Sequence, residues 1–481
     1  MVIFDEIDAL VADDMSRLPL QSGKQMDNIV RQLTNGVEAV VVLTGTPYVA
    51  NKPSGKIMAI YQTINPVEFL NMKLGKSFMA LRDFNHTAAY NMLTDNVTIR
   101  RHTKDLYSQQ PKVAVKDVKV NIRPGTKESE IVKNIEDLAS EAIANAIGRM
   151  DQAAENRELG VVGKKDDEEK NSTYMEVLAQ LQLLRWLTSM NPIIGEHLYK
   201  YKRNLDPSFS DAKKSMMVLQ EANRLNLESN IALSEKEQVL VELCTQIVKT
   251  KKKVIVFFPF VKDTVRAQYI LEKVGIKVFM LTSDIKKKDR PAVVDAAREY
   301  ADGCVLITTS LGYRAISLPE FNHAVIVSPS YNPSDFAQAI ARIKRMTQLH
   351  KKLFIHFILY CNTVEQWIYN LIVAPKIGES MDLEDRPVAD REKDNVLFGG
   401  GKVDRGNVYR KFVDDMKAMH LKRATITTTF DLAATMSYFD AGVEMFEEDL
   451  SSLIGNTDVF IKKYGIEGVL DNKSENSCEK E

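Results

Sequence analysis

The chain has 481 residues, and its 64 Lys and Arg residues are balanced by 65 Asp and Glu residues, for a formal charge of -1. This balance excludes a protein that is basic overall, so any nucleic-acid site has to be a local patch. Hydrophobic residues make up 44% of the chain and charged residues 27%, a composition that is typical of a folded protein and argues against wholesale disorder. At roughly 150 residues per domain, the length predicts about three domains.

Cysteine use and hydropathy restrict the class of protein further. The four cysteines lie far apart without a CxxC pair, which argues against a disulfide framework and against a zinc cluster. No apolar run reaches the roughly 18 residues that span a bilayer, and the N-terminus lacks the basic residues of a signal peptide. We therefore expect a soluble, intracellular protein with reduced thiols. The cysteines are Cys244, Cys304, Cys361 and Cys478.

Residues 1–120 have the pattern of part of an α/β lobe, with apolar runs at residues 1–4 and 39–43 that predict two strands. Asp5 and Glu6 directly follow the first strand. Ligands of a parallel α/β sheet bind at the carboxyl ends of its strands. A carboxylate there can hold Mg²⁺ directly or through water, while its neighbour orients the water that attacks a γ-phosphate. An acidic pair in this place also occurs at an ordinary helix N-terminus.

The second predicted strand ends in a turn of small residues. Thr44 and Thr46 offer hydroxyls, and Gly45 allows close approach of the backbone, so the turn can sense a nucleotide and link it to a neighbouring groove. With Asp5 and Glu6, these residues resemble the DExx and threonine-rich motifs of superfamily-two helicases.

Beyond residue 120 the pattern changes twice. Residues 121–250 have apolar positions at helical spacing and predict a helical insertion. Residues 251–375 alternate β-rich runs with helical stretches, which predicts a complete parallel sheet covered on both faces. Residues 376–481 predict a mainly helical extension with a polar tail. The predicted strands are 254–258, 277–281, 304–308, 324–327 and 353–359; the predicted helices are 261–274, 289–301 and 334–347, with another from 363.

Residues 338–348 resemble the last motif of the Swi/Snf-type ATPases. Arg342 and Arg345 are three residues apart, so on a helix they would share a face and both could point at one phosphate. Arginines of this kind neutralise charge that develops in phosphoryl transfer and are worth about 10³ to 10⁵ in rate. A basic helix face is otherwise usually a solvated surface.

Other segments match this family in the required order. They are a paired-arginine segment at 96–106, the end of the helical insertion at 183–192, a first strand of the second lobe at 254–260, Tyr331-Asn332-Pro333, and a helix start at 363–365. The resemblance covers about residues 1–372. It implies an α/β protein with two RecA-like lobes, the first incomplete, that binds ATP and Mg²⁺ between the lobes and double-stranded DNA across them.

The resemblance also implies roles for individual residues. Asp5, which would hold Mg²⁺ through water, and Glu6, Arg342 and Arg345 are the implied catalytic residues. The implied nucleotide contacts are Thr44, Gly45, Thr46, Gly312 and Gln338.

Two segments of the second lobe are candidate DNA contacts. Residues 306–318 resemble the motif that couples nucleotide to DNA, but Ala315 and Ser310 replace the family's second glycine and its arginine. Hydroxyls and amides at a strand end suit phosphate oxygens, and the loop at 282–290 combines hydroxyls with four cations that would track one strand of a duplex. The alternative for that loop is a solvated turn. The predicted DNA-binding residues are Lys286, Lys287, Lys288, Arg290, Thr308 and Thr309.

The sequence contains no GxxxxGK[ST] loop, whose amides and lysine cradle the phosphates of ATP. The family places that loop before the acidic motif, so we expect it on another polypeptide or on residues that precede Met1. Three hypotheses follow: a piece of a duplex-DNA-translocating ATPase, a DNA-binding scaffold that does not use nucleotide, and another superfamily-two machine such as a strand-separating helicase or a viral transcription ATPase.

Overall fold

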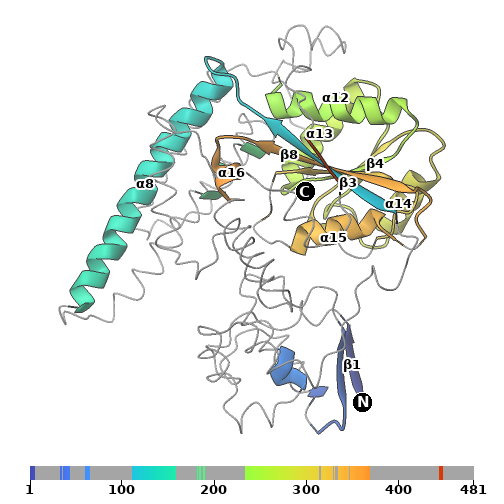
Figure 1. Cartoon of the computed structure of the whole chain (residues 1–481), viewed down its shortest axis with the longest axis horizontal. Helices are drawn as coiled ribbons and strands as arrows, with labels where there is room; N and C mark the ends of the chain where they lie inside the picture. Colours follow the sequence, from blue (N-terminus) through green and yellow to red (C-terminus); the bar gives the residue numbers. More distant parts are fainter. Residues whose placement is uncertain are drawn as a thin grey trace.

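The computed structural model describes residues 1–5, 33–43 without 35, 60–64, 111–158, part of 181–189, 233–368 with short gaps, and 444–447. Within these ranges the chain forms a large sheet with helices on both faces and a separate two-stranded sheet (Figure 1). The predicted α/β class with parallel sheets is confirmed.

The large sheet has the strand order β5-β6-β4-β7-β8-β3-β9, and every neighbouring pair is parallel. β4 and β6 are buried along their whole length, as continuous apolar strands are when both faces are covered. The five strands predicted between residues 254 and 359 are present. The strands of this sheet are β3 (Lys112–Val120), β4 (Val254–Phe257), β5 (Val278–Leu281), β6 (Val305–Thr308), β7 (His323–Val327), β8 (Lys352–Tyr360) and β9 (Glu444–Glu447).

Helices α12 (Glu235–Lys249) and α13 (Val261–Lys273) cover one face of this sheet, and α14 (Arg290–Glu299) and α15 (Ser334–Ile343) cover the other (Figure 1). On the first face, apolar side chains of both helices form one core with those of the strands. A short 3-10 turn, η1 (Ser310–Tyr313), follows β6, and α16 (Val364–Ile368) follows β8.

Because all strands run the same way, their ends lie along one side of the sheet and their starts along the other. We call these sides the carboxyl edge and the amino edge. The carboxyl edge is where parallel α/β sheets bind ligands, so the residues that follow the strands decide what this sheet can do.

Two segments lie in this sheet although the sequence pattern placed them elsewhere. β3, predicted within residues 1–120, pairs with β8 over nine residues from Lys112↔Lys352 to Val120↔Tyr360. β9 comes from the extension that was predicted to be mainly helical, and it pairs with β3. α12, assigned to the helical insertion, supplies core residues of the same unit. The predicted boundaries at 120 and 250 therefore do not match the structural unit, because a strand's sheet is decided by its partner.

In the two-stranded sheet, β1 (Val2–Asp5) pairs in parallel with β2 (Val40–Leu43). Both strands lie where the apolar runs at residues 1–4 and 39–43 predict them. One face carries Phe4, which is buried against Ile60. The other exposes apolar side chains, with Ile3 56% and Leu43 50% accessible. Its register opposes Asp5 to Leu43, so both strands end at one edge.

Helix α8 (Lys127–Glu158) follows β3 and extends away from the sheet as one helix of 32 residues (Figure 1). α8 lies within residues 121–250, where the sequence predicts helices. Among the described residues, none of the helices combines the length and apolarity needed to cross a bilayer. Cys244 and Cys304 are buried free thiols and Cys361 is a half-buried one, whereas Cys478 lies outside the described residues.

Candidate functional site

The carboxyl ends of β5 and β6 form the open part of the carboxyl edge. After β5, Lys286, Lys287 and Lys288 are exposed in a loop closed by a hydrogen bond from the Asp289 amide to the Lys286 carbonyl at 2.9 Å. Arg290 folds back on this loop, because its Nε donates to the Ile285 carbonyl at 3.0 Å. The loop is therefore shaped by its own arginine, with three lysines presented to solvent.

The end of β6 packs against this loop from inside. Thr308 is fully buried, and its hydroxyl donates to the Leu281 carbonyl at 2.7 Å. The predicted contact between this hydroxyl and a DNA phosphate is therefore wrong for this conformation, because the hydroxyl is already used in tying β6 to β5. Thr309 is 7% accessible, and its carbonyl accepts from the Gly312 amide at 2.8 Å.

Gly312 is at a position where a side chain would not fit. A Cβ there would lie 2.4 Å from Thr308 Cγ2 and 2.6 Å from Thr308 Oγ1. Because the clash is with a side chain enclosed by the sheet, glycine is needed for η1 to fold onto β6.

Arg342 connects α15 to the segment after η1. Its Nη1 donates to the Ile316 carbonyl at 3.1 Å, and its Nε donates to the Gln338 carbonyl at 3.1 Å. The Leu318 amide in turn donates to the Arg342 carbonyl at 3.0 Å. Side chain and backbone of this arginine are thus both fixed to the chain that continues from β6.

Arg345 does not lie on the same helix face as Arg342, contrary to the prediction. α15 ends at Ile343, and the Arg345 amide donates to the Ile343 carbonyl at 3.1 Å instead of continuing the helical pattern. The end of the helix is capped by Gln348, whose Nε2 donates to the Ile343 carbonyl and, at 3.0 Å, to the Phe321 carbonyl. The side chain thus satisfies a terminal carbonyl that has no partner within the helix.

The acids predicted to face these arginines are only partly described. Asp5 ends β1, and its backbone opposes Leu43, but nothing is described of its side chain. Glu6, Thr44, Gly45 and Thr46 lie outside the described residues. The meeting of these acids with the arginines therefore stays a prediction.

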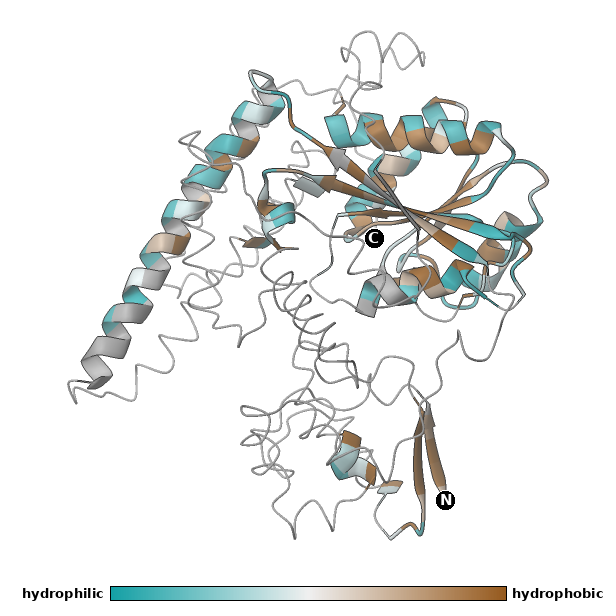
Figure 2. Cartoon of the chain, viewed as in Figure 1, coloured by the Kyte–Doolittle hydropathy of each residue, from teal (hydrophilic) through white to brown (hydrophobic). Residues whose placement is uncertain are grey.

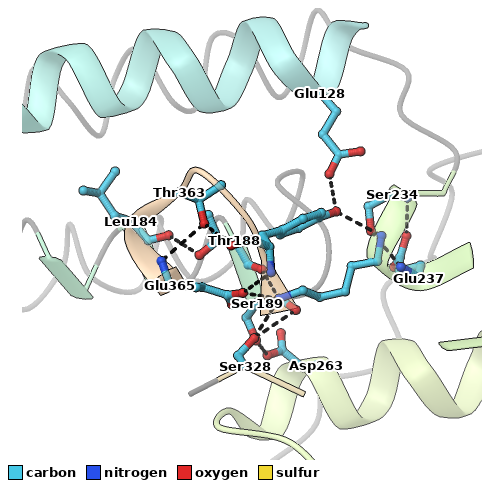
Figure 3. Close-up of polar contacts among 12 residues, drawn as sticks. Glu128, Leu184, Thr188, Ser189, Ser234, Glu237, Asp263, Ser328, Thr363 and Glu365 are labelled. Atoms are coloured by element: carbon cyan, nitrogen blue, oxygen red, sulfur yellow. Dashed lines mark hydrogen bonds and ion pairs between the residues drawn. The ribbon is translucent and has the colours of Figure 1, made fainter. Parts of the chain in front are cut away.

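The other part of the carboxyl edge, at the ends of β7, β8 and β3, is closed by a buried polar network (Figure 3). Its centre is Lys236 at the start of α12, which is fully buried. The Lys236 Nζ donates to both carboxylate oxygens of Glu365 at 2.7 and 2.6 Å, to the Thr188 carbonyl at 2.7 Å and to the Ser328 hydroxyl at 2.9 Å. All three ammonium protons are thus satisfied.

Further contacts join this network to α8 and α13. The Lys236 amide donates to the Tyr360 hydroxyl at 3.0 Å, and that hydroxyl donates to Glu128 of α8. The Ser189 hydroxyl donates to Asp263 of α13. Sequence analysis missed this network, although the spacing of Ser234 and Glu237, which form a capping box at the start of α12, is a recognisable helix start.

Two acids of this network hold their protons unusually tightly. Burial raises the pKa of Asp263 to about 7, although the hydrogen bond from Ser189 and the charge of Lys236 oppose the shift. Burial likewise raises the pKa of Glu128 to about 7, against the hydrogen bond from Tyr360. Burial lowers the pKa of Lys236, while Glu365 opposes that shift. The closed part of the edge therefore contains a structural ion pair, Lys236 with Glu365, and two acids, Asp263 and Glu128, that can take up a proton.

Residues 235–347 match the family model of the helicase conserved C-terminal domain. The match covers α12 to α15, with the lysine loop, Gly312 and Arg342 inside it. This part of the chain is therefore similar to the C-terminal domain of helicases, as the resemblance of residues 306–318 and 338–348 predicts. The chain is 23% identical over 205 residues to the DNA excision repair protein ERCC-6-like of Danio rerio. The aligned residues are 41% of this chain and 14% of that protein.

The Bos taurus protein of the same name is 29% identical over 89 residues, which are 18% of this chain and 7% of that protein. The chain thus matches a small part of the length of these relatives. Among solved structures, the Pyrococcus furiosus Hef helicase domain aligns with a TM-score of 0.44 at 16% identity, over 76% of this chain and 73% of that one. The Sulfolobus solfataricus SWI2/SNF2 ATPase core in complex with dsDNA aligns with a TM-score of 0.36 at 16% identity, over 81% and 71%.

Proposed function

We propose that the chain is part of an ATP-dependent motor that translocates along double-stranded DNA, with a phosphate-binding loop supplied from outside these 481 residues. The observation that carries the proposal is the hydrogen bond from Arg342 to the Ile316 carbonyl. It joins an arginine of the expected nucleotide site to the segment that continues from β6, beside the exposed lysine loop. A motor needs such a link between its nucleotide and its track.

The lysine loop is the proposed grip on DNA. Lys286, Lys287 and Lys288 are exposed on a loop whose shape Arg290 maintains. Each phosphate that they neutralise would add about 0.9 to the slope of log affinity against log salt. Thr309 is the remaining hydroxyl candidate at the end of β6, since Thr308 is committed to Leu281.

The link to the nucleotide runs through η1. Gly312 fits against Thr308 without space for a side chain, and the segment after η1 holds Arg342 through Ile316 and Leu318. A shift of the loop or of β6 on DNA would therefore move Arg342. These contacts are the proposed route of coupling between DNA and nucleotide, and mutation of their members tests it.

The nucleotide site itself is proposed from residue chemistry. Carboxylates such as Asp5 suit Mg²⁺, and Glu6 would orient the attacking water. Arg342 and Arg345 would neutralise charge on the phosphoryl group as it is transferred. The proposed nucleotide contacts are Thr44, Gly45, Thr46, Gly312 and Gln338.

A first experiment tests the function as a whole. The chain is mixed with, or fused to, a polypeptide that carries a GxxxxGK[ST] loop on a RecA-like half-lobe, and ATP hydrolysis is measured with and without duplex DNA. We expect hydrolysis that duplex DNA stimulates. DNA binding without any hydrolysis would instead favour a nucleotide-independent scaffold, and unwinding of a forked duplex would favour a strand-separating helicase.

A second experiment tests the catalytic assignments in that reconstituted enzyme. Glu6→Gln should keep nucleotide binding and lower turnover by orders of magnitude, and Arg342→Ala should lower turnover about 10³-fold at unchanged DNA affinity. Lys287→Gln is the matched comparison, since it should weaken DNA binding while turnover at saturating DNA is retained. If Arg342→Ala lowered DNA affinity first, the arginine would be misassigned.

A further inference from the structure

The amino edge of the large sheet is lined with lysines. Lys112 and Lys352 are the first residues of β3 and β8, Lys277 directly precedes β5, and three consecutive lysines precede β4. We call this set the amino-edge lysines. It consists of Lys112, Lys251, Lys252, Lys253, Lys277, Lys351 and Lys352.

The strand order turns these residues into a row. Across the sheet the lysines precede β5, then β4, then β8, then β3. At about 4.8 Å between neighbouring strands, the five intervals from β5 to β3 span about 24 Å. In Figure 2 the loops along this side of the sheet, at the right of the view, are in the hydrophilic colours.

In the part of the chain that the structure describes, this edge carries fewer acids than lysines. Among the described residues, the acids on the connections that reach this edge are Glu272, Glu299, Asp302 and Glu320, and Glu444 is the first residue of β9 beside β3. Glu320 is engaged by Arg298 at 3.0 Å, and Asp302 lies 3.4 Å from Lys251. In a chain with a net charge of -1, positive charge has therefore been gathered on one edge.

At two positions of this edge, lysine is a residue that the local structure disfavours. Lys112 lies directly opposite Lys352 in the register of β3 and β8, and like charges in that relation are destabilising. Lys251 has a φ of 59°, a left-handed conformation that glycine or asparagine adopts more easily. A contact between these charges and an anionic ligand would account for lysine at both places.

The row fits the backbone of a nucleic acid better than a protein surface. Duplex DNA carries a charge every 1.7 Å of its axis, so a line of cations about 24 Å long can follow one stretch of backbone. A protein partner would use large apolar anchors. Among the described residues of this edge, Leu349 is the large apolar side chain that is well exposed.

We propose that the amino-edge lysines form a second contact with a nucleic-acid phosphate backbone, at the edge opposite the lysine loop of residues 286–288. Strands of four or five residues, at about 3.3 Å per residue, keep the two edges more than about 13 Å apart. The two surfaces therefore contact different stretches of nucleic acid. This inference does not depend on ATP hydrolysis.

The test is a salt titration of duplex binding with the full chain. A fluorescent duplex of about 30 base pairs is bound at several salt concentrations, and the slope of log affinity against log salt is measured by anisotropy. The amino-edge variant combines Lys251→Gln, Lys277→Gln and Lys351→Gln, three exposed residues at three different strands. We expect the slope to fall by about 2.7, which is about 0.9 for each of three phosphates.

Two other variants make the outcome decisive. The loop variant, Lys286→Gln with Lys287→Gln and Lys288→Gln, removes the same charge from the opposite edge, and its loss of slope should add to that of the amino-edge variant. Lys133→Gln, at an exposed position of α8, is the control and should lose no slope. Thermal midpoints of all variants should match the wild type.

Each possible result of the titration either supports or overturns the inference. An unchanged affinity and slope in the amino-edge variant would overturn the inference, whatever the loop variant does. Loss of slope in the amino-edge variant alone would uphold it and would instead count against the DNA grip proposed for the loop. Binding of a polyglutamate peptide at this edge, with duplex binding unchanged by the three substitutions, would likewise overturn it.

Discussion

Both parts of the carboxyl edge are formed by the ends of parallel strands, but their charged side chains are exposed in one part and buried in the other. At the ends of β5 and β6, lysines are exposed, and Arg342 of α15 donates a hydrogen bond to the segment that follows the glycine turn η1. At the ends of β7, β8 and β3, Lys236 and Glu365 are 0% and 1% accessible and fully hydrogen-bonded. The position of an edge in a sheet therefore does not make it a binding site. What matters is whether its charges remain in water.

The largest expected effect comes from breaking the closed part. Lys236→Met leaves Glu365 buried without its cation, which should lower the free energy of unfolding by about 3–5 kcal/mol, as measured by denaturant unfolding. Lys287→Met in the open part should change it by less than about 0.5 kcal/mol. Adding Glu365→Gln to Lys236→Met should restore part of the loss, and equal stability of the two single variants would contradict this comparison.

A smaller effect is expected at the boundary between β6 and η1. Gly312→Ala places a methyl group against Thr308 and should cost about 1–3 kcal/mol of unfolding free energy. The matched control is Gly148→Ala in α8, where the added Cβ meets nothing within 4 Å and helix propensity should contribute about 0.5–1 kcal/mol of stabilisation. A neutral Gly312→Ala would show that the packing at η1 is loose.

A third effect is a dependence of stability on pH, which arises from the buried acids of the closed part. The folded state holds the proton of Asp263 up to about pH 7, whereas the ordinary pKa is 3.8. Between these values the folded state binds more protons than the unfolded one, so the contribution of Asp263 to stability falls as the pH rises from about 4 to about 7. Glu128 acts in the same direction.

Thermal unfolding at several pH values measures this dependence. Asp263→Asn should flatten the profile between pH 4 and 7, whereas Asp284→Asn, on the exposed loop after β5, should leave it as in the wild type. Superimposable profiles for wild type and Asp263→Asn would mean that Asp263 does not titrate in this range.

Part of the fold and of the candidate site can be predicted from local sequence patterns alone. The strands β4 to β8 are short apolar runs between helical stretches, and burial on both faces requires that pattern. The exposed lysines after β5 and the arginine of α15 were also identified from residue type and order. The prediction that Arg342 and Arg345 share a helix face was wrong because α15 ends at Ile343, where Gln348, farther along the chain, caps the helix.

The sequence by itself determined the α/β class, the five central strands and the candidate residues of the open edge, because these depend on neighbours in the chain. Only the tertiary structure decided that β3 pairs with β8, and that Lys236 is buried with Glu365, Ser328 and Thr188, which lie 129, 92 and 48 residues away. Pairing and burial are set by partners distant in sequence, and no local pattern names those partners.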